Sequence, residues 1–143
     1  MEPFRYAVRL EPAEEGGFVV TCRDLPQLVT QGEDLANALT EAADAMDEVF
    51  AAYMHGGLTL PAPSKKRKGE HVVSPPAETM VKAALYVAMK EAGISKVQLA
   101  KRLGVDEKEV RRLLDPQYGS KLPRIAQAVE ALGRRLVIGL KAS

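Results

Sequence analysis

The basic side chains around Arg112 are the residues of this sequence whose types and spacing most clearly indicate a chemical role. Lys108, Arg111 and Arg112 lie in the stretch "QLAKRLGVDEKEVRRLL", which runs from Gln98 to Leu114. An arginine can form two parallel hydrogen bonds to one guanine, and basic side chains also pair with phosphate. The three residues therefore predict a surface that binds DNA. Arg111 or Arg112 is the better candidate for reading a base.

A glycine in the middle of this stretch separates two predicted helices. Gly104 would destabilise a continuous helix by about 1 kcal/mol relative to alanine. Ser95 and Gln98 fit the S/T-x-x-E/Q capping box, and Asp106 and Glu109 have the related D-x-x-E form. We therefore expect helices that begin near residues 96 and 107, with Gly104 ending the first helix in a left-handed conformation. Two short helices joined by a tight turn form a helix-turn-helix.

Apolar residues and charge both fit this prediction. Ala100 is small where the two helices would approach each other, and Val105 would pack inward after the turn. Residues 94–124 hold eight basic and four acidic residues, a net charge of +4. Any helical hairpin needs small and apolar residues, so a purely structural role stays open, but the caps, glycine and alanine together favour DNA binding. The other expected core positions are Leu99, Leu103, Val110, Leu113 and Leu114.

The second helix of such a motif lies in the major groove, where its N-terminal and exposed residues contact bases. We expect Lys96, Ser120 and Lys121 to contact phosphates, which position the protein without specifying sequence. Glu107 would either repel phosphate or accept a hydrogen bond from cytosine. Together with the three basic residues of the second helix, these form the predicted DNA-binding set: Lys96, Lys108, Arg111, Arg112, Ser120 and Lys121.

The C-terminal residues predict a helix followed by a strand. "KLPRIAQAVEALGRR" has helical spacing, with Ile125, Val129 and Leu132 on its core face, whereas "RLVIGL" alternates between its two faces over residues 136–140. A lone terminal strand has no partner inside a helical domain. Pairing with its copy in a second chain would provide one, so we expect a homodimer or a higher homo-oligomer.

The N-terminal part predicts a small antiparallel sheet and one helix. "FRYAVRLEP" alternates like a half-buried strand, "FVVTC" is a second strand after the turn "EEGG", and residues 28–29 suggest a brief third strand. A helix is expected from about Glu33 to Met54, ended by "HGG". A short strand is expected at 71–73 and another helix in "AETMVKAALYVAMKEAG", with Met80, Ala84, Val87 and Met89 as the candidates for its core face. The expected core face of the first helix is Leu35, Leu39, Ala42, Met46, Val49, Phe50 and Tyr53.

The charge is divided between the two halves of the chain. Residues 1–60 hold three basic and eleven acidic residues, a net charge of −8, whereas residues 61–143 hold seventeen and eight, a net charge of +9. "PAPSKKRKGE" between the halves has the composition of a solvated linker. We therefore predict an α+β protein with an N-terminal domain at 1–60, a basic linker and short strand at 61–74, and an all-α helix-turn-helix domain with a terminal strand at 75–143.

Catalysis and metal binding have weak support. Asp24 is the one acidic residue near the predicted strand ends that could act, and His55 and His71 flank the linker without metal-ligand spacing. Cys22 is the only cysteine, which excludes an internal disulfide. We therefore expect no catalytic residues, no metal and no cofactor. No apolar run approaches the roughly 18–20 residues needed to span a membrane, and no signal peptide is visible, so the cytoplasm is the expected compartment.

Three stretches make the chain resemble the HicB family of bacterial antitoxins, in its longer form with a helix-turn-helix. They are "EEGGFVVTCRDLPQLVTQGEDLANAL", "LAKRLGV" and "SKLPRIAQAVEALGRRL". The first has the family's order of hairpin, D-L-P, V-T-Q-G and a helix that begins at an acidic residue. The sequence departs from the family at Gln27, where a glycine is usual after D-L-P, which puts the conformation of that loop in question.

The resemblance implies a partner and two roles. The partner is a HicA toxin, an mRNA-cleaving ribonuclease with a catalytic histidine and a fold like that of double-stranded-RNA-binding domains. The antitoxin's N-terminal domain resembles an incomplete ribonuclease H fold and blocks that toxin, and its C-terminal domain represses the operon by binding operator DNA. A ligand-sensing repressor without a toxin is the alternative. We expect toxin contacts at Asp24, Leu25, Pro26 and Leu28, and at the helix acids Glu41, Asp44 and Glu48.

Overall fold

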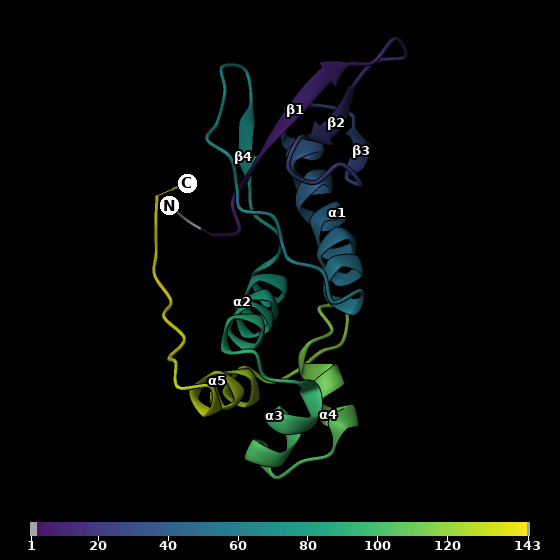
Figure 1. Cartoon of the computed structure of the whole chain (residues 1–143). Coiled ribbons are helices and arrows are strands. Elements are labelled where there is room, and N and C mark those ends of the chain that lie inside the picture. Colours follow the sequence, from purple (N-terminus) through teal and green to yellow (C-terminus); the bar gives the residue numbers. More distant parts are fainter. Residues whose placement is uncertain (1–2, 143) are drawn as a thin grey trace. The chain divides into compact units, whose positions relative to one another are not determined.

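The computed structural model describes residues 3–142, and its contacts divide the chain into two compact units. The first unit ends at Met80 and the second begins at Val81. Figure 1 labels the four strands and five helices of the described residues. The strands all belong to the first unit, so the predicted α+β class is confirmed.

A four-stranded antiparallel sheet and one helix form the first unit. The sheet has the order β3-β2-β1-β4, and every neighbouring pair is antiparallel. Helix α1 covers one face of the sheet (Figure 1), and the other face is left without a covering helix. The elements are β1 (Tyr6–Pro12), β2 (Phe18–Cys22), β3 (Val29–Gly32), α1 (Leu35–His55) and β4 (His71–Val73).

Alternation along the strands builds the core beneath α1. Tyr6, Val8 and Val20 point to the helix side and are completely buried, as is Phe50 of α1. The rings of Tyr6 and Phe50 meet edge to face, with their centroids 5.8 Å apart. Burial raises the pKa of the Tyr6 hydroxyl to about 12. The predicted strands of the first unit are confirmed, but burial does not alternate strictly along them, because Ala7 between Tyr6 and Val8 is also buried and no residue of β3 is fully buried.

Gly32 lets α1 approach the sheet closely. A side-chain carbon at this position would lie 2.4 Å from the backbone of Ala38 in the first turns of α1. Asp34 caps the helix, since its side chain accepts a 2.8 Å hydrogen bond from the backbone N–H of Asn37. The helix therefore begins at Leu35 rather than at Glu33. The prediction that Leu35 belongs to the core is wrong, because this first-turn residue is 45% exposed.

The stretch predicted as a linker belongs to the first unit. It contributes β4, which was predicted as a short strand and pairs with β1. The Tyr6 hydroxyl donates to the carbonyl of Pro61 at 2.6 Å, and the hydroxyl of Thr79 donates to Asp47 in α1 at 2.7 Å. Residues 61–80 thus complete the sheet and its hydrogen bonds, and they do not behave as a solvated spacer between two domains.

Short helices form the second unit, and the predicted helix-turn-helix is confirmed. Ser95 and Gln98 make a reciprocal capping box, and Asp106 accepts from the backbone N–H of Glu109 at 2.9 Å. Gly104 has φ +68° and ψ +31°, the left-handed conformation that glycine adopts without strain. The helices are α2 (Ala77–Ala92), which crosses the unit boundary, α3 (Lys96–Leu103), α4 (Glu107–Leu113) and α5 (Leu122–Ala131).

Two details of the second unit differ from the sequence expectations. Four α2 residues were predicted to face the core; Met89 is buried as predicted, but Met80, Ala84 and Val87 are only half-buried. The buried side of α2 includes a lysine, so the apolar pattern alone does not mark it. The buried residues of α2 are Thr79, Lys82, Ala83, Leu85, Tyr86, Ala88 and Met89.

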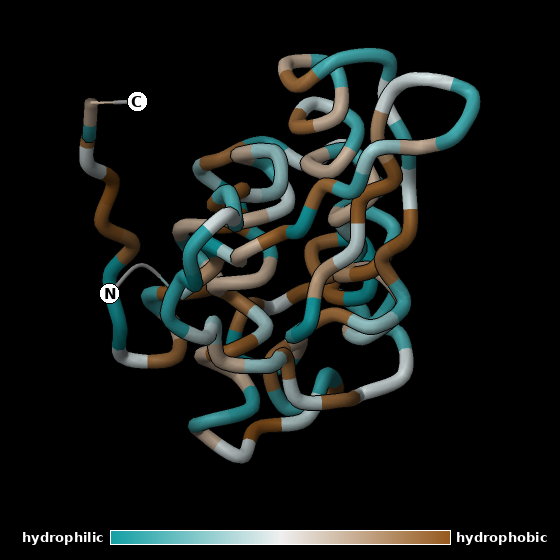
Figure 2. Tube along the Cα trace, turned by 90° about the horizontal axis from the view of Figure 1, so that it is seen from above, coloured by the Kyte–Doolittle hydropathy of each residue, from teal (hydrophilic) through white to brown (hydrophobic). Residues whose placement is uncertain are grey.

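The predicted C-terminal strand is not formed within the described chain. Residues 134–142 have no regular secondary structure. Val137 is 78% exposed, Ile138 is 70% exposed and Leu140 is fully exposed. Figure 2 shows hydrophobic stretches along this irregular C-terminal segment. A strand needs a hydrogen-bonded neighbour, and the single chain offers none there, so pairing with a second chain stays a prediction.

Candidate functional site

The second helix of the helix-turn-helix presents basic side chains to solvent. Lys108 and Arg111 are exposed, and the side chain of Arg112 is 39% exposed. Leu99, Val110 and Leu113 are buried and fix α3 against α4. Lys108 lies three residues before Arg111 and four before Arg112, so it neighbours both arginines on the surface of α4. The structure therefore brings the three predicted base readers together.

Each arginine of α4 has a carboxylate partner. Arg111 pairs with Glu107 at 3.2 Å, and Arg112 pairs with Glu109 at 3.8 Å. Glu109 also lies 4.0 Å from Arg124 of α5. These pairs are solvent-accessible, so each contributes only about 0–1 kcal/mol and can be exchanged for phosphate or base contacts at low cost. A hollow of about 410 Å³ lies beside them, lined by Val105, Asp106, Lys108, Glu109, Arg112 and Arg124.

An aromatic ring also contacts Arg112. The guanidinium carbon of Arg112 lies 5.2 Å from the centroid of the Tyr118 ring, within range of a cation–π interaction. Tyr118 belongs to the loop that joins α4 to α5, and it is 44% exposed. Arg112 is therefore held between the Tyr118 ring and the Glu109 carboxylate. The sequence analysis missed Tyr118, because nothing in the local pattern connects this loop residue to α4.

A buried lysine fixes the same loop. Lys82 of α2 is completely buried, and its Nζ donates hydrogen bonds to the carbonyls of Arg112 at 3.0 Å and Asp115 at 2.8 Å. It also donates to the carbonyl of Tyr118 and, at 2.9 Å, to the hydroxyl of Ser120. Buried ammonium groups are tolerated only when their donors are satisfied. Lys82 thus satisfies carbonyls at the end of α4 and ties the following loop to α2.

The predicted phosphate contacts have different environments. Lys96 is half-buried at the start of α3, and Lys121 is exposed at the N-cap of α5. Ser120 already accepts from Lys82, which gives its hydroxyl a structural role that the sequence did not indicate. Arg124 was not selected from the sequence, although its exposed side chain lies near Glu109 of α4.

The D-L-P segment of the first unit is largely structural. Asp24 accepts hydrogen bonds from the backbone N–H of Ser64 at 2.7 Å and from its hydroxyl at 2.5 Å. Leu25 is completely buried and Leu28 is 1% exposed, so these two predicted toxin contacts do not present their side chains on the surface of the single chain. Leu25 and Leu28 begin and end a tight turn, in which the N–H of Leu28 donates to the carbonyl of Leu25 at 2.9 Å. The two residues between them are exposed. Pro26 is exposed.

Gln27 resolves the question raised by the missing glycine. None of the described non-glycine residues has a positive φ, so this loop needs no glycine at residue 27. The side-chain carbonyl of Gln27 accepts a 3.1 Å hydrogen bond from the hydroxyl of Tyr53 in α1. The larger residue is therefore used as a contact between the loop and the helix.

Two different surfaces of the first unit are accessible to a partner. On α1, Asp44 and Glu48 are exposed and Glu41 is half-buried, so the predicted acidic face is present. On the uncovered face of the sheet, Val19 is 37% exposed and Val29 is 66% exposed. Val19 lies opposite Gln31 and Val29 lies opposite Thr21, which places the two valines diagonally across the β2–β3 pair.

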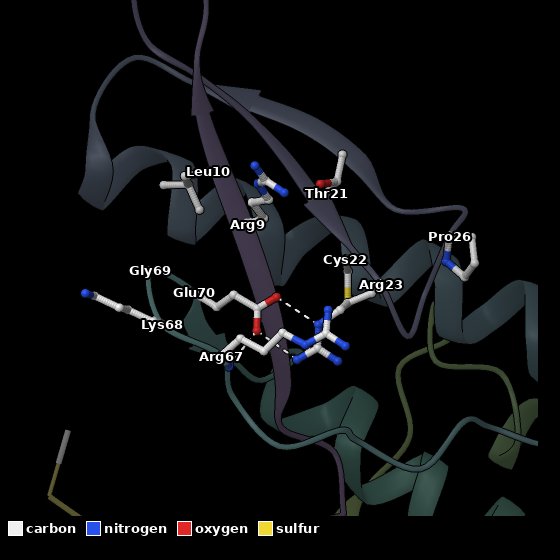
Figure 3. Close-up of a pocket in the computed structure, with 10 residues that line it drawn as sticks. All are labelled: Arg9, Leu10, Thr21, Cys22, Arg23, Pro26, Arg67, Lys68, Gly69 and Glu70. Carbon is white, nitrogen blue, oxygen red and sulfur yellow. Dashed lines mark hydrogen bonds and ion pairs between the residues drawn. The ribbon is translucent and has the colours of Figure 1, made fainter.

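A hollow of about 660 Å³ lies on the uncovered side of the sheet, between β1, β2 and residues 67–70 (Figure 3). Arg23 crosses it and forms two hydrogen bonds to Glu70, at 2.9 and 2.8 Å, and a third to the carbonyl of Lys65 at 2.8 Å. These bonds from Arg23, with the backbone N–H of Arg67, lower the pKa of Glu70 to about 2. The ion pair of Arg23 with Glu70 thus joins the end of β2 to the segment before β4.

No three His, Cys, Asp or Glu side chains gather as a metal site within residues 3–142. None of the helices in this range combines the length and apolar character needed to cross a membrane.

Comparison with known proteins identifies the family. A sequence profile described as the HicB-like antitoxin of bacterial toxin–antitoxin systems matches residues 5–84. The chain belongs to the HicB antitoxin family. Antitoxin HicB of Escherichia coli (strain K12) is 34% identical over 132 residues, which cover 92% of this chain and 96% of that protein. Antitoxin HicB of Pseudomonas fluorescens is 34% identical over 142 residues, covering 98% and 96%, and Antitoxin HicB 1 of Photorhabdus laumondii is 31% identical over 137 residues, covering 96% and 87%.

The extent of the match to the HicB family agrees with the structure of the first unit. The matched residues extend beyond the predicted linker and through β4, as does the unit defined by its contacts. The curated HicB relatives are matched over almost their whole lengths, so they share the C-terminal region as well as the sheet.

Proposed function

We propose that this HicB-family antitoxin uses its first unit to inhibit a basic, HicA-like ribonuclease and its second unit to repress its own operon. The observation that carries the proposal is a helix-turn-helix with three basic side chains on the outer side of its second helix. Charge supports the division of labour. Residues 1–80 hold seven basic and thirteen acidic residues, a net charge of −6, whereas residues 81–143 hold thirteen and six, a net charge of +7.

Operator binding is supported by the geometry of α4. Its N-terminal half and its basic side are free of covering elements of the second unit, as a helix that enters the major groove requires. Lys108, Arg111 and Arg112 are the proposed base readers, and Lys96 and Lys121 are proposed to pair with phosphates. Ser120 is the least favoured of the predicted set, because its hydroxyl is already bonded to Lys82.

Operator binding can be tested on the full-length chain with DNA from upstream of its own gene and unrelated DNA of equal length. Arg112→Ala should reduce the preference for the upstream DNA by at least about 1 kcal/mol, because a base contact is lost. Lys121→Ala should weaken binding to both DNAs alike and reduce the salt slope by about one, because a phosphate contact is lost. A wild-type chain that shows no preference and no salt dependence would contradict the proposal.

Toxin inhibition is supported by acidity and by exposed apolar side chains. An enzyme that holds RNA needs a basic surface, and an acidic domain can be steered to that surface and cover it. Because Leu25 and Leu28 are buried, we propose Val19 and Val29 on the uncovered sheet face, with Pro26, as apolar anchors. Glu41, Asp44 and Glu48 on α1 are proposed to accelerate association. Asp24 is proposed to act indirectly, through its bonds to Ser64.

The neutralising role can be tested by co-expression with the protein of the neighbouring gene. Full-length antitoxin should co-purify with that protein and restore growth, and the double variant Val19→Asp, Val29→Asp should lose both effects while remaining folded. The matched control is Val97→Asp, at an exposed valine of the second unit. Failure of the wild-type chain to bind the neighbouring protein would favour the alternative of a repressor that senses a small ligand.

A further inference from the structure

The surroundings of Arg112 contain a connected set of contacts that the DNA-binding motif alone does not require. Lys82 in α2 binds the carbonyl of Tyr118, and its Nζ lies 5.8 Å from the centroid of the Tyr118 ring. The other cation at that ring is Arg112, at 5.2 Å. The ring of one loop residue thus lies within cation–π range of a buried ammonium and of a partly exposed guanidinium.

Lys82 differs from Tyr118 and Arg112 in its exposure to solvent. Lys82 is completely buried and bonded to four acceptors, so its position is fixed by the interior of the second unit. Tyr118 is 44% exposed, and the Arg112 side chain is 39% exposed. A tyrosine so exposed adds little to a core. The contact that its ring makes is with the guanidinium of Arg112. Arg112 lies four residues after Lys108, so both project from the same side of α4.

Restricting an arginine before it binds has a physical consequence. The Arg side chain loses rotamer freedom when it is fixed on a partner. A side chain that is already ordered in the free protein has lost part of that freedom before binding, which improves affinity and geometry. An aromatic face can order a guanidinium without using its N–H donors, so the donors remain available for a guanine edge.

We propose that Tyr118 is a positioning residue that orients Arg112 for base recognition, and that Lys82 holds the loop presenting it. This inference rests on the proposed operator binding of the second unit. Glu109 restrains Arg112 through its charge, at 3.8 Å, whereas Tyr118 restrains the plane of the guanidinium through its ring. The positioning therefore depends on the ring and not on the tyrosine hydroxyl.

The orientation itself is testable in the full-length protein without DNA. In NMR spectra, the Nε–H group of Arg112 should show a ring-current shift and slowed guanidinium rotation. Tyr118→Phe should preserve both signatures and Tyr118→Ala should abolish them, with the melting temperature unchanged within a few degrees. If Tyr118→Ala leaves the Arg112 signals as in the wild type, the positioning role is wrong, whatever the protein binds.

The effect on recognition is tested with the same two DNAs as the operator proposal. Tyr118→Ala should weaken binding to upstream DNA about threefold to tenfold and change binding to unrelated DNA less than twofold. Tyr118→Phe should bind both as the wild type does. The double variant Tyr118→Ala, Arg112→Ala should bind no more weakly than Arg112→Ala, because the two residues act as one unit.

Different failures have different meanings in this experiment. Additive losses in the double variant, or equal losses from Tyr118→Phe and Tyr118→Ala, would overturn the positioning role while operator binding stands. A wild-type chain without preference for the upstream DNA would overturn operator recognition and, with it, the proposed purpose of the ordered Arg112. The NMR comparison would then still report whether the ring orders the side chain.

Discussion

The two units of this antitoxin hold their shape by different kinds of interaction. In the first unit, long-range bonds join distant residues: Tyr6 to Pro61, Arg23 to Glu70 and Asp24 to Ser64. In the second unit, the starts of α3 and α4 are fixed within three residues, by the capping box of Ser95 and the cap at Asp106, and the long-range bonds described above come from Lys82. The acidic unit is thus closed by the segment that follows it, whereas the basic unit combines locally capped helices with one buried lysine.

This difference matches what each unit is proposed to do. A helix-turn-helix must present one rigid helix, and local caps with a single buried lysine can achieve that. A surface that covers an enzyme must be broader, and here a sheet of four strands supplies it. The 61–80 segment contributes to the first unit both its edge strand β4 and the partner carboxylate of Arg23.

The largest effect should come from shortening the chain inside this segment. A fragment ending at Pro61 lacks β4, Ser64 and Glu70, so it should not unfold cooperatively, whereas a fragment ending at residue 84 should. Circular dichroism during heating of the two fragments measures this. A cooperative transition in the shorter fragment would show that the sheet is complete without β4.

The contrast also explains what could be predicted from the sequence. The helix-turn-helix was predictable to the residue, because Ser95, Asp106 and Gly104 act on their immediate neighbours. The strands at 18–22 and 71–73 followed from apolar alternation. The role of residues 61–70 could not be predicted, since a basic, proline-containing stretch has the composition of a linker and its bonds to Arg23 and Asp24 are non-local.

Burial that the sequence pattern does not reveal accounts for the other differences. Lys82 lies on the buried side of α2, so apolar periodicity found Met89 but also selected the half-buried Met80, Ala84 and Val87. Leu25 and Leu28 were chosen as partner anchors because they are apolar residues beside Asp24, but a tight turn buries both in the single chain. Tyr118 could not be linked to Arg112 without the loop conformation that Lys82 stabilises.

The next largest effect should come from Lys82. Lys82→Met keeps the length of the side chain but leaves three carbonyls and a hydroxyl without their donor, which should cost at least about 3 kcal/mol. For a unit of this size, the melting temperature should fall by about 10–20 °C. The matched control is Lys101→Met on the exposed side of α3, which should melt as the wild type does. Calorimetry that finds equal melting temperatures would contradict the anchoring role.

Removing the exposed apolar C-terminal residues should change the oligomeric state of the protein. Without residues 135–143 the chain should sediment as a monomer, because the proposed pairing of residues 136–140 with a second copy is lost. Binding to upstream DNA should weaken about 100-fold, since two linked half-sites become one. Secondary structure should be unchanged, as residues 135–142 form none in the single chain. An unchanged oligomer in sedimentation would rule out the tail as the dimer contact.

A smaller effect should come from the ion pair of Arg23 with Glu70 in the first unit. Its contribution to the melting temperature should depend on pH. The folded protein lowers the pKa of Glu70 from its ordinary value of 4.5 to about 2 through Arg23, so it favours the ionised carboxylate. This contribution is complete above about pH 4.5 and is lost as the pH falls toward 2. Glu70→Gln should therefore melt a few degrees lower at pH 7, with the difference disappearing near pH 2. Glu15→Gln, in the exposed hairpin turn, should show no such dependence.

The smallest effect on affinity should come from the acidic face of α1. Reversing Glu41, Asp44 and Glu48 to lysine removes attraction between the first unit and a basic toxin. Exposed charge pairs contribute only about 0–1 kcal/mol each, whereas steering changes association rates strongly at low salt. Stopped-flow measurements should therefore show association slowed about tenfold or more at low ionic strength and far less at 0.5 M salt, with dissociation nearly unchanged. The matched control reverses the exposed residues Glu91, Glu107 and Glu130 in the second unit and should leave toxin association unaffected. An association rate that ignores both salt and the α1 reversals would mean that the acidity of the first unit serves solubility, and that the apolar sheet face carries recognition by itself.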